Sequence, residues 1–346
     1  MNGFSGAPGV IYDQKLFNRD VRRDIRNCVL FIALFYIINI AASGIVMAAH
    51  MLSNPSLVSS IENAAAGSGF FGSGGPSDIA SAVESAADGQ TTGLMSIAGI
   101  VAGGCVFLFL RKKRFFTDLA LPAAEKLTPM IFIILVVISQ AIQVVYGLII
   151  SLIDFVMPGG LSITDSYESL FESLYTPVGL LYIILIGPIF EELIFRGAIM
   201  GVLRRFGANF AILFSALLFG FYHMTIMQIP FGFVMGLLLG YAASRWSLRA
   251  SIALHIIVNG LSALLSMQAG NAVFAGAAGF VMLACVIATV IMAISWRGTL
   301  GARIRGGAAY YENTYRYGFS SIAFWVYIAV TATVGVLMLN SPGLTF

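Results

Sequence analysis

The sequence predicts an all-α protein, built as a polytopic bundle of transmembrane helices. Of its 346 residues, 59% are hydrophobic and only 10% are charged, whereas a soluble domain carries about 25% charged residues. Apolar stretches of about 20 residues, long enough to cross a bilayer as helices, recur along the chain. The net charge of +3 is small, so the placement of the charges is more informative than their sum.

Nine apolar stretches are candidate membrane spans. They cover residues 28–50, 93–110, 129–155, 175–200, 208–224, 230–246, 250–268, 272–295 and 319–340. Basic residues between these stretches indicate the orientation, because cytoplasmic loops carry an excess of Lys and Arg. If the N-terminus is cytoplasmic, all of the 19 Lys and Arg residues except Arg196, which lies inside the fourth stretch, fall on the cytoplasmic side. We therefore expect about nine spans, with the N-terminus inside and the C-terminus outside.

Four regions follow from this pattern. Residues 1–27 form a basic cytoplasmic N-terminus, and residues 28–155 hold three accessory spans with a flexible, Gly-, Ser- and Ala-rich outer loop at 53–92. Residues 175–270 contain the polar core, and residues 271–346 add two C-terminal spans. The stretch between the last two spans is basic and aromatic, which is typical of an anchor at the lipid headgroups. We expect contact with the lipid bilayer and no nucleic-acid partner.

The fourth apolar stretch contains three charged residues, Glu191, Glu192 and Arg196. Each charge near the centre of a membrane helix costs roughly 2.5–3.5 kcal/mol, so such residues face the bundle interior and mark a functional site by default. Glu192 and Arg196 have the i, i+4 spacing of an intrahelical ion pair. Glu191 points about 100° away around the helix. We expect Glu192 to be paired and structural, and Glu191 to be the better general base.

Two histidines also lie in apolar stretches. His223 follows Phe219 by four residues in the fifth stretch, and His255 precedes Asn259 by four residues in the seventh. Residues with this spacing share one helix face. By helical rise, Glu191 lies about 20 Å from the cytoplasmic boundary and His255 only about 9 Å. Either the helices are tilted, or the seventh stretch begins inside a water-filled vestibule. A proton-coupled transporter would also use such residues, but no internal repeat or pair of broken helices is visible.

Together these residues resemble a known pattern. Glu191–Arg196, Phe219–His223 and His255–Asn259 look like the EExxxR, FxxxH and HxxxN motifs of the CPBP intramembrane protease family, in the family's order. That family includes the type II CAAX prenyl endopeptidases and bacteriocin-immunity proteins. The resemblance covers roughly residues 175–270.

The resemblance implies an intramembrane endopeptidase that hydrolyses a peptide bond of a membrane protein or peptide. It implies a multi-pass protein of the membrane, which we place in the plasma membrane of a prokaryote. The implied roles are activation of water by Glu191, positioning of that water by His223, stabilisation of the oxyanion by His255 and Asn259, and support by Glu192, Arg196 and Phe219. The alternative is a binding or immunity protein of the membrane that keeps the motifs without proteolysis.

The sequence leaves the role of a metal open. The soluble metalloprotease signature H-E-x-x-H is absent. Glu191, His223 and His255 could still provide three zinc ligands and leave a fourth position open. The same residues could also act without a metal, with the glutamate as the base. Metal-dependent and glutamate-dependent hydrolysis are therefore both compatible with the motifs.

Overall fold

The computed structural model describes residues 14–56, 58–59, 88–111, 125–156, 174–306 and 313–340. Every regular element in these ranges is a helix, so the all-α prediction is confirmed. The elements are α1 (Gln14–Ser53), α4 (Gly89–Arg111), α6 (Pro129–Val156), α8 (Pro177–Leu181), η2 (Tyr182–Ile186), α9 (Gly187–Glu192), η3 (Leu193–Ile199), α10 (Met200–Leu203), η4 (Arg204–Phe206), α11 (Ala208–Tyr222), α12 (Gln228–Arg245), α13 (Leu248–Met267), α14 (Ala272–Gly306), α15 (Thr314–Phe319) and α16 (Ile322–Asn340). Of these, η2 and η3 are π-helical and η4 is a 3₁₀ turn.

The nine predicted stretches fall on these helices with shifted ends. The first helix begins at Gln14, so the described basic residues of the N-terminal region share one helix with the first apolar stretch. The fifth stretch was predicted to reach residue 224, but α11 ends at Tyr222. It ends there because Met224 adopts a φ of 55°, a left-handed conformation that cannot continue a right-handed helix. Most of the predicted outer loop lies outside the described residues.

Five helices are long and apolar enough to cross a membrane. They are Lys15–Ser53, Pro129–Val156, Pro177–Phe206, Leu248–Met267 and Ala272–Thr299. Two further apolar helices, at Ala208–Tyr222 and Ile322–Leu337, are shorter. These lengths support an integral membrane protein. The total of nine spans and the orientation with the N-terminus inside stay predictions.

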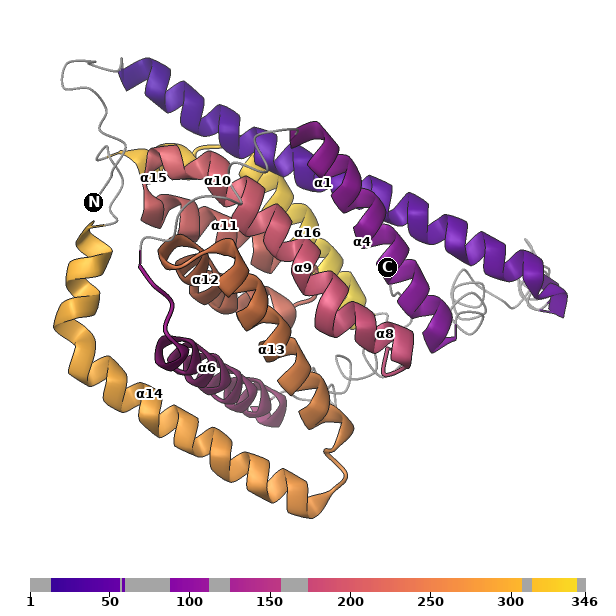
Figure 1. Cartoon of the computed structure of the whole chain (residues 1–346). Coiled ribbons are helices and arrows are strands. Elements are labelled where there is room, and N and C mark those ends of the chain that lie inside the picture. The colour runs from indigo at the N-terminus through magenta and orange to yellow at the C-terminus, as the bar shows by residue number, and fades with distance from the viewer. Residues whose placement is uncertain are drawn as a thin grey trace.

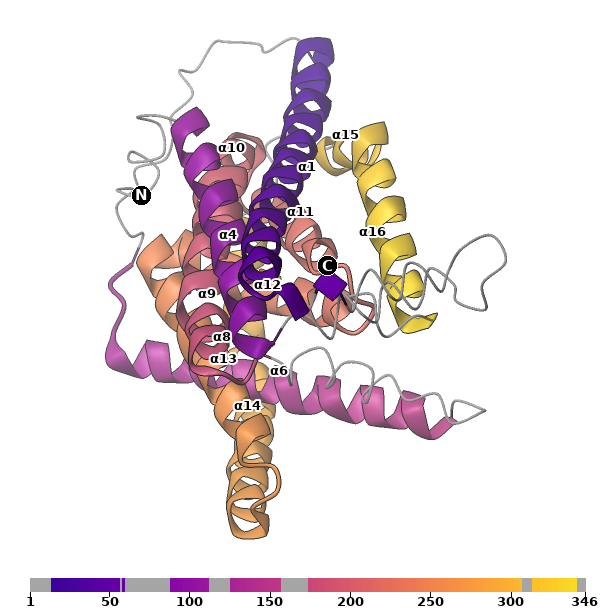
Figure 2. The ribbon, with the colours of Figure 1, turned by 90° about the vertical axis from the view of Figure 1, so that its right-hand side faces the viewer.

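The helices α9 to α13 lie between two groups of neighbours (Figure 1). On one side α1 packs along α4 and also contacts α15 and α16. On the other side α6 contacts α12, α13 and α14. Figure 2 shows α6 running across the direction of α13 and α14. Helices that cross in this way cannot all lie parallel to one membrane normal, so the number of spans does not follow from hydropathy alone.

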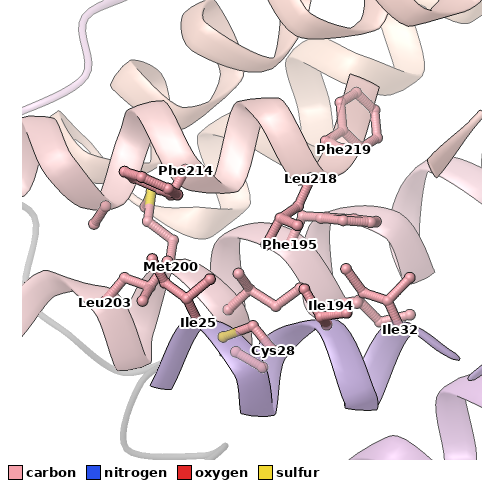
Figure 3. Close-up of a cluster of buried hydrophobic side chains, with 14 of the residues drawn as sticks. Ile25, Cys28, Ile32, Ile194, Phe195, Met200, Leu203, Phe214, Leu218 and Phe219 are labelled. Atoms are coloured by element: carbon pink, nitrogen blue, oxygen red, sulfur yellow. The ribbon is translucent and has the colours of Figure 1, made fainter. Parts of the chain in front are cut away.

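A hydrophobic cluster joins α1 to the helices that carry the charged residues. Ile25, Cys28 and Ile32 lie on one face of α1 and are buried against η3, α10 and α11 (Figure 3). Within a membrane such packing stabilises through van der Waals contact, because lipid tails are as apolar as the side chains themselves. The accessory N-terminal helix is therefore part of the same packed core as the fourth and fifth apolar stretches.

A face of glycines lets α12 approach α11 closely. Gly232, Gly236 and Gly240 are spaced four residues apart on α12. A Cβ atom added at Gly232 would lie 3.2 Å from the Cα of Gly220, and one added at Gly236 would lie 3.1 Å from the Cα of Ala216. Small residues on both helices thus bring the two backbones together, as is common between membrane helices.

We expect Gly220→Ala to lower the free energy of unfolding by roughly 1–3 kcal/mol, the usual cost of overpacking. The added Cβ would lie 2.6 Å from the carbonyl oxygen of Ile229 and 2.9 Å from the amide nitrogen of Phe233. Both are backbone atoms of α12, so the helices would have to separate. Thermal unfolding in detergent measures the effect. Gly276→Ala is the matched control, because a Cβ there meets no described atom within 4 Å. Equal melting temperatures for Gly220→Ala and the wild type would contradict the close approach.

Candidate active site

Glu192 and Arg196 form an ion pair inside the bundle. The Nη1 atom of Arg196 lies 2.7 Å from Oε1 of Glu192, and both side chains are fully buried. The pair predicted from the i, i+4 spacing is therefore present. Removing one partner from such a pair leaves an uncompensated charge in an apolar environment, which is costly. This pair consequently ties the chemistry of the site to the stability of the fold.

The Arg196 guanidinium makes two further contacts, although its buried Nε atom has no hydrogen-bond partner among the described residues. Its Nη2 atom donates a hydrogen bond to the carbonyl of Gly236 at 3.3 Å. Its Cζ atom lies 4.1 Å from the ring centroid of Phe219, a cation–π geometry. The Phe219 ring also packs edge-to-face against His223 and His255, with centroid distances of 4.8 and 5.9 Å. Phe219 therefore contacts the cation and both histidines at once.

Glu192 has two further partners on α13. Its Oε2 atom accepts a hydrogen bond from the Ser251 hydroxyl at 2.5 Å, and its Oε1 atom lies 3.1 Å from Nδ1 of His255. With Arg196, these groups surround the carboxylate with donors. Sequence reasoning missed Ser251. The clue was available, because Ser251 precedes His255 by four residues and so lies on the same helix face.

The hydrogen bonds assign the same tautomer to both histidines. His255 Nδ1 faces the Glu192 carboxylate, and His223 Nδ1 lies 3.0 Å from the carbonyl oxygen of Phe219. Both partners only accept hydrogen bonds, so each Nδ1 carries the proton. Each Nε2 is left with a lone pair when the ring is neutral. The two rings are thus held at one nitrogen and available at the other.

Glu191 differs from its neighbour in having few partners. Its side chain is 12% exposed, and its Oε2 atom lies 3.7 Å from Nε2 of His255. Among the described residues, no hydrogen bond to the Glu191 carboxylate is present. The phenols of Tyr36, Tyr182 and Tyr222 lie within electrostatic reach of its charge. One carboxylate of the adjacent pair is saturated with donors, and the other retains capacity to bind a further molecule.

Asn259 makes a hydrogen bond that the motif did not predict. Its Nδ2 atom donates to the carbonyl of Ile183 at 2.9 Å. That carbonyl lacks a backbone donor for two reasons. In the π-helical turn, Gly187 N–H bonds to Tyr182 instead, and the next residue, Pro188, has no N–H. Asn259 therefore fills a gap in the helix that carries Glu191, and its second Nδ2 hydrogen remains for another acceptor.

The structure brings Glu191 and His255 together in spite of the different depths that helical rise gave them. Glu191 and His255 lie 3.7 Å apart, although their distances from the predicted membrane boundary differ by about 11 Å when counted at 1.5 Å per residue. Irregular turns flank α9, with η2 before it and η3 after it. Such π-helical segments are frequent at functional sites.

The donors do not converge as the zinc alternative requires. Across the described ranges, no three His, Cys, Asp or Glu side chains are placed to hold one metal ion. Glu191, His223 and His255 therefore do not form the three-ligand set of a catalytic zinc site. The zinc alternative is not supported by this arrangement.

These features define a class of protein: a membrane-embedded helical bundle with a buried site of glutamate and histidine. Residues 173–261 match the family model described as "Type II CAAX prenyl endopeptidase Rce1-like". This match confirms the predicted resemblance to the CPBP family for this segment. No curated protein and no solved structure matches the chain. The matched segment comprises α8 to most of α13, and α1, α4, α6, α14, α15 and α16 lie outside it.

Proposed function

We propose that the chain is an intramembrane endopeptidase in which Glu191 activates water. The observation that carries this proposal is the contrast between two adjacent buried carboxylates. Glu192 is saturated by Arg196, Ser251 and His255, whereas Glu191 has one long contact with His255. A general base needs a free lone pair beside the group that it deprotonates. The Rce1-like match supports protease activity of this type.

In this mechanism Glu191 takes a proton from a water molecule as the water oxygen attacks the peptide carbonyl carbon. His223 accepts the second hydrogen of that water at Nε2 and so orients it. Glu191 then gives the proton to the amine that leaves when the C–N bond breaks. One water molecule and one peptide bond give a new carboxyl terminus and a new amino terminus. Glu191 takes up one proton and releases it again, so the enzyme returns to its starting protonation state.

Negative charge develops on the carbonyl oxygen during attack, and the site needs donors for it. His255 can donate from Nε2 only as the imidazolium, because its Nδ1 proton is directed at Glu192. The Glu192 carboxylate stabilises that cation by direct hydrogen bonding. The second Nδ2 hydrogen of Asn259 is the other proposed donor. Glu192 and Arg196 thus act through His255 rather than on the substrate.

The proposed substrate is a membrane-embedded protein or peptide, because the site is buried among apolar helices. The preference for a prenylated CAAX sequence belongs to the proteins after which the family model is named, and we do not extend it to this chain. We propose the plasma membrane of a prokaryote as the location.

Incubation of the purified protein in nanodiscs with membrane peptides in H₂¹⁸O tests the function. Hydrolysis puts one ¹⁸O atom in the new C-terminal carboxyl group, which mass spectrometry detects. Absence of any cleaved, labelled product across a broad peptide set would favour the non-proteolytic binding or immunity alternative.

A separate experiment tests whether the activity depends on a metal. The protein is treated with a chelator, and its metal content is measured by elemental analysis alongside its activity. A loss of zinc together with activity would restore the zinc alternative.

We expect Asn259→Ala to lower kcat by roughly 10²–10³, as for loss of an oxyanion donor, with a smaller change in KM. It should also destabilise the protein by about 1–3 kcal/mol, because the partly buried Ile183 carbonyl loses its donor. The two effects separate in a double variant. Adding Pro188→Ala restores a backbone N–H that can serve this carbonyl, so the melting temperature should recover while kcat stays low. Recovery of both would show that Asn259 acts only on the helix.

A further inference from the structure

Three tyrosine hydroxyls, each from a helix outside the Rce1-like segment, donate to backbone carbonyls on either side of His223. These hydrogen bonds are Tyr36 of α1 to Tyr222, Tyr327 of α16 to Leu218 at 2.9 Å, and Tyr146 of α6 to Met227 at 2.5 Å. They fix the last turn of α11 and the short connection to α12. The family model covers neither these tyrosines nor their helices.

The bond from Tyr36 completes the end of α11. The last four carbonyls of a helix have no partner within it and need donors from elsewhere. Here the donors to residues 219, 220, 221 and 222 are, in order, His223 Nδ1, the backbone N–H of His223, the backbone N–H of Met224 and the Tyr36 hydroxyl. Three of the four bonds are therefore made by His223 and its immediate neighbour, and Tyr36 supplies the fourth.

The backbone after His223 needs such support. Met224 has a φ of 55°, a left-handed conformation that is unfavourable for a side chain other than glycine and persists only when its surroundings enforce it. Helix α16 packs closely on this turn, since a Cβ added at Gly335 would lie 2.9 Å from the Met224 carbonyl oxygen. The Tyr36 ring also stacks on Tyr222 with a centroid distance of 5.2 Å.

We propose that Tyr36 is a positioning residue for His223, and this proposal rests on the proposed hydrolysis. Its hydroxyl holds the Tyr222 carbonyl and so fixes the end of α11. This keeps His223 Nδ1 on the Phe219 carbonyl and Nε2 available to orient water. An accessory helix outside the Rce1-like segment thus completes the active site. Tyr36 does not touch the reacting atoms and acts only through His223.

We expect Tyr36→Phe to lower kcat roughly 10- to 100-fold, by analogy with the partners that orient metal-ligating histidines, with KM nearly unchanged. The variant keeps the stacked ring and removes only the hydroxyl. In a His223→Ala background the same change should cost nothing further, because the group that Tyr36 positions is already gone. An equal loss in both backgrounds would overturn the proposal. Tyr315→Phe is the matched control, since its ring contacts Phe210 near the opposite end of α11.

A second measurement does not depend on activity. The chain contains 3 histidines, so histidine-selective ¹⁵N labelling gives a spectrum simple enough to assign by substitution. We expect His223 to show the Nδ1-protonated tautomer in the wild type and a mixture of tautomers in Tyr36→Phe, with His50 unchanged. An unchanged His223 signal in Tyr36→Phe would overturn the positioning role. Failure of the wild type to cleave any peptide would overturn the hydrolysis alone, and the His223 signal would still decide the positioning role.

Discussion

Glu191→Gln is expected to abolish hydrolysis. The expected fall in kcat is roughly 10²–10⁴-fold, the usual contribution of a general base. Glutamine is nearly isosteric with glutamate but cannot accept the proton of the attacking water. The Glu191 carboxylate has a single long contact with His255, so the substitution breaks no hydrogen bond or close ion pair among the described residues. Peptide cleavage in nanodiscs should therefore be lost, while the melting temperature of the same sample stays close to that of the wild type.

The control for this experiment is Glu125→Gln. Glu125 pairs with Arg245 at 2.7 Å, and both side chains are about a third exposed. Glu125 lies before α6, away from the site. Glu125→Gln therefore makes the same change of charge and shape without touching the proposed catalytic residues. Activity of Glu191→Gln within about twofold of the wild type would remove Glu191 from the mechanism, since a lost general base costs far more than that.

Arg196→Ala is expected to cost roughly 3–5 kcal/mol of folding stability, the range for breaking a buried ion pair. It leaves Glu192 charged at a position with no exposed surface. Ser251 and His255 would still donate to the carboxylate, but the guanidinium that lies 2.7 Å from Glu192 Oε1 would be gone. Denaturant or thermal unfolding in detergent measures the loss. An unchanged melting temperature would show that the pair is solvated in the membrane protein.

A double variant separates the charge of the Glu192–Arg196 pair from its packing. Combining Arg196→Met with Glu192→Gln removes both charges and keeps much of the volume, so stability should recover relative to Arg196→Ala. Activity should not recover, because His255 loses the carboxylate that stabilises its imidazolium. Arg245→Ala is the comparison at the partly exposed pair with Glu125, where we expect a cost below about 1 kcal/mol.

The charged and polar residues of the site could be predicted because they are expensive in an apolar stretch. Glu191, Glu192 and Arg196 stand out for this reason, and the i, i+4 spacing correctly predicted the pair between Glu192 and Arg196. The same spacing predicted that His255 and Asn259 lie on one face of their helix. Helical rise alone placed Glu191 and His255 at different depths, however. That count assumes helices that are parallel, regular and equally placed in the membrane.

Two of the contacts that sequence reasoning missed are made to backbone carbonyls. Asn259 donates to the Ile183 carbonyl only because a π-helical turn and Pro188 leave that carbonyl without a donor. Tyr36 donates to the Tyr222 carbonyl across 186 positions of the chain. A free carbonyl carries no mark in the sequence, since every residue has one. Such contacts become visible only when the helix ends and irregular turns are known.

By itself, the sequence determined the all-helical class, the segments that form helices and the charged residues that must face the interior. Each of these follows from the cost of polar groups in an apolar environment, which is a local property of a stretch of chain. Only the tertiary structure decided that α6 runs across its neighbours (Figure 2) and that α1 packs into one hydrophobic cluster with η3, α10 and α11 (Figure 3). It also decided that Ser251 and His255 join Arg196 around Glu192, the carboxylate that the spacing had predicted to be paired. Those outcomes depend on how side chains of distant helices fit together, and hydropathy and spacing do not encode that fit.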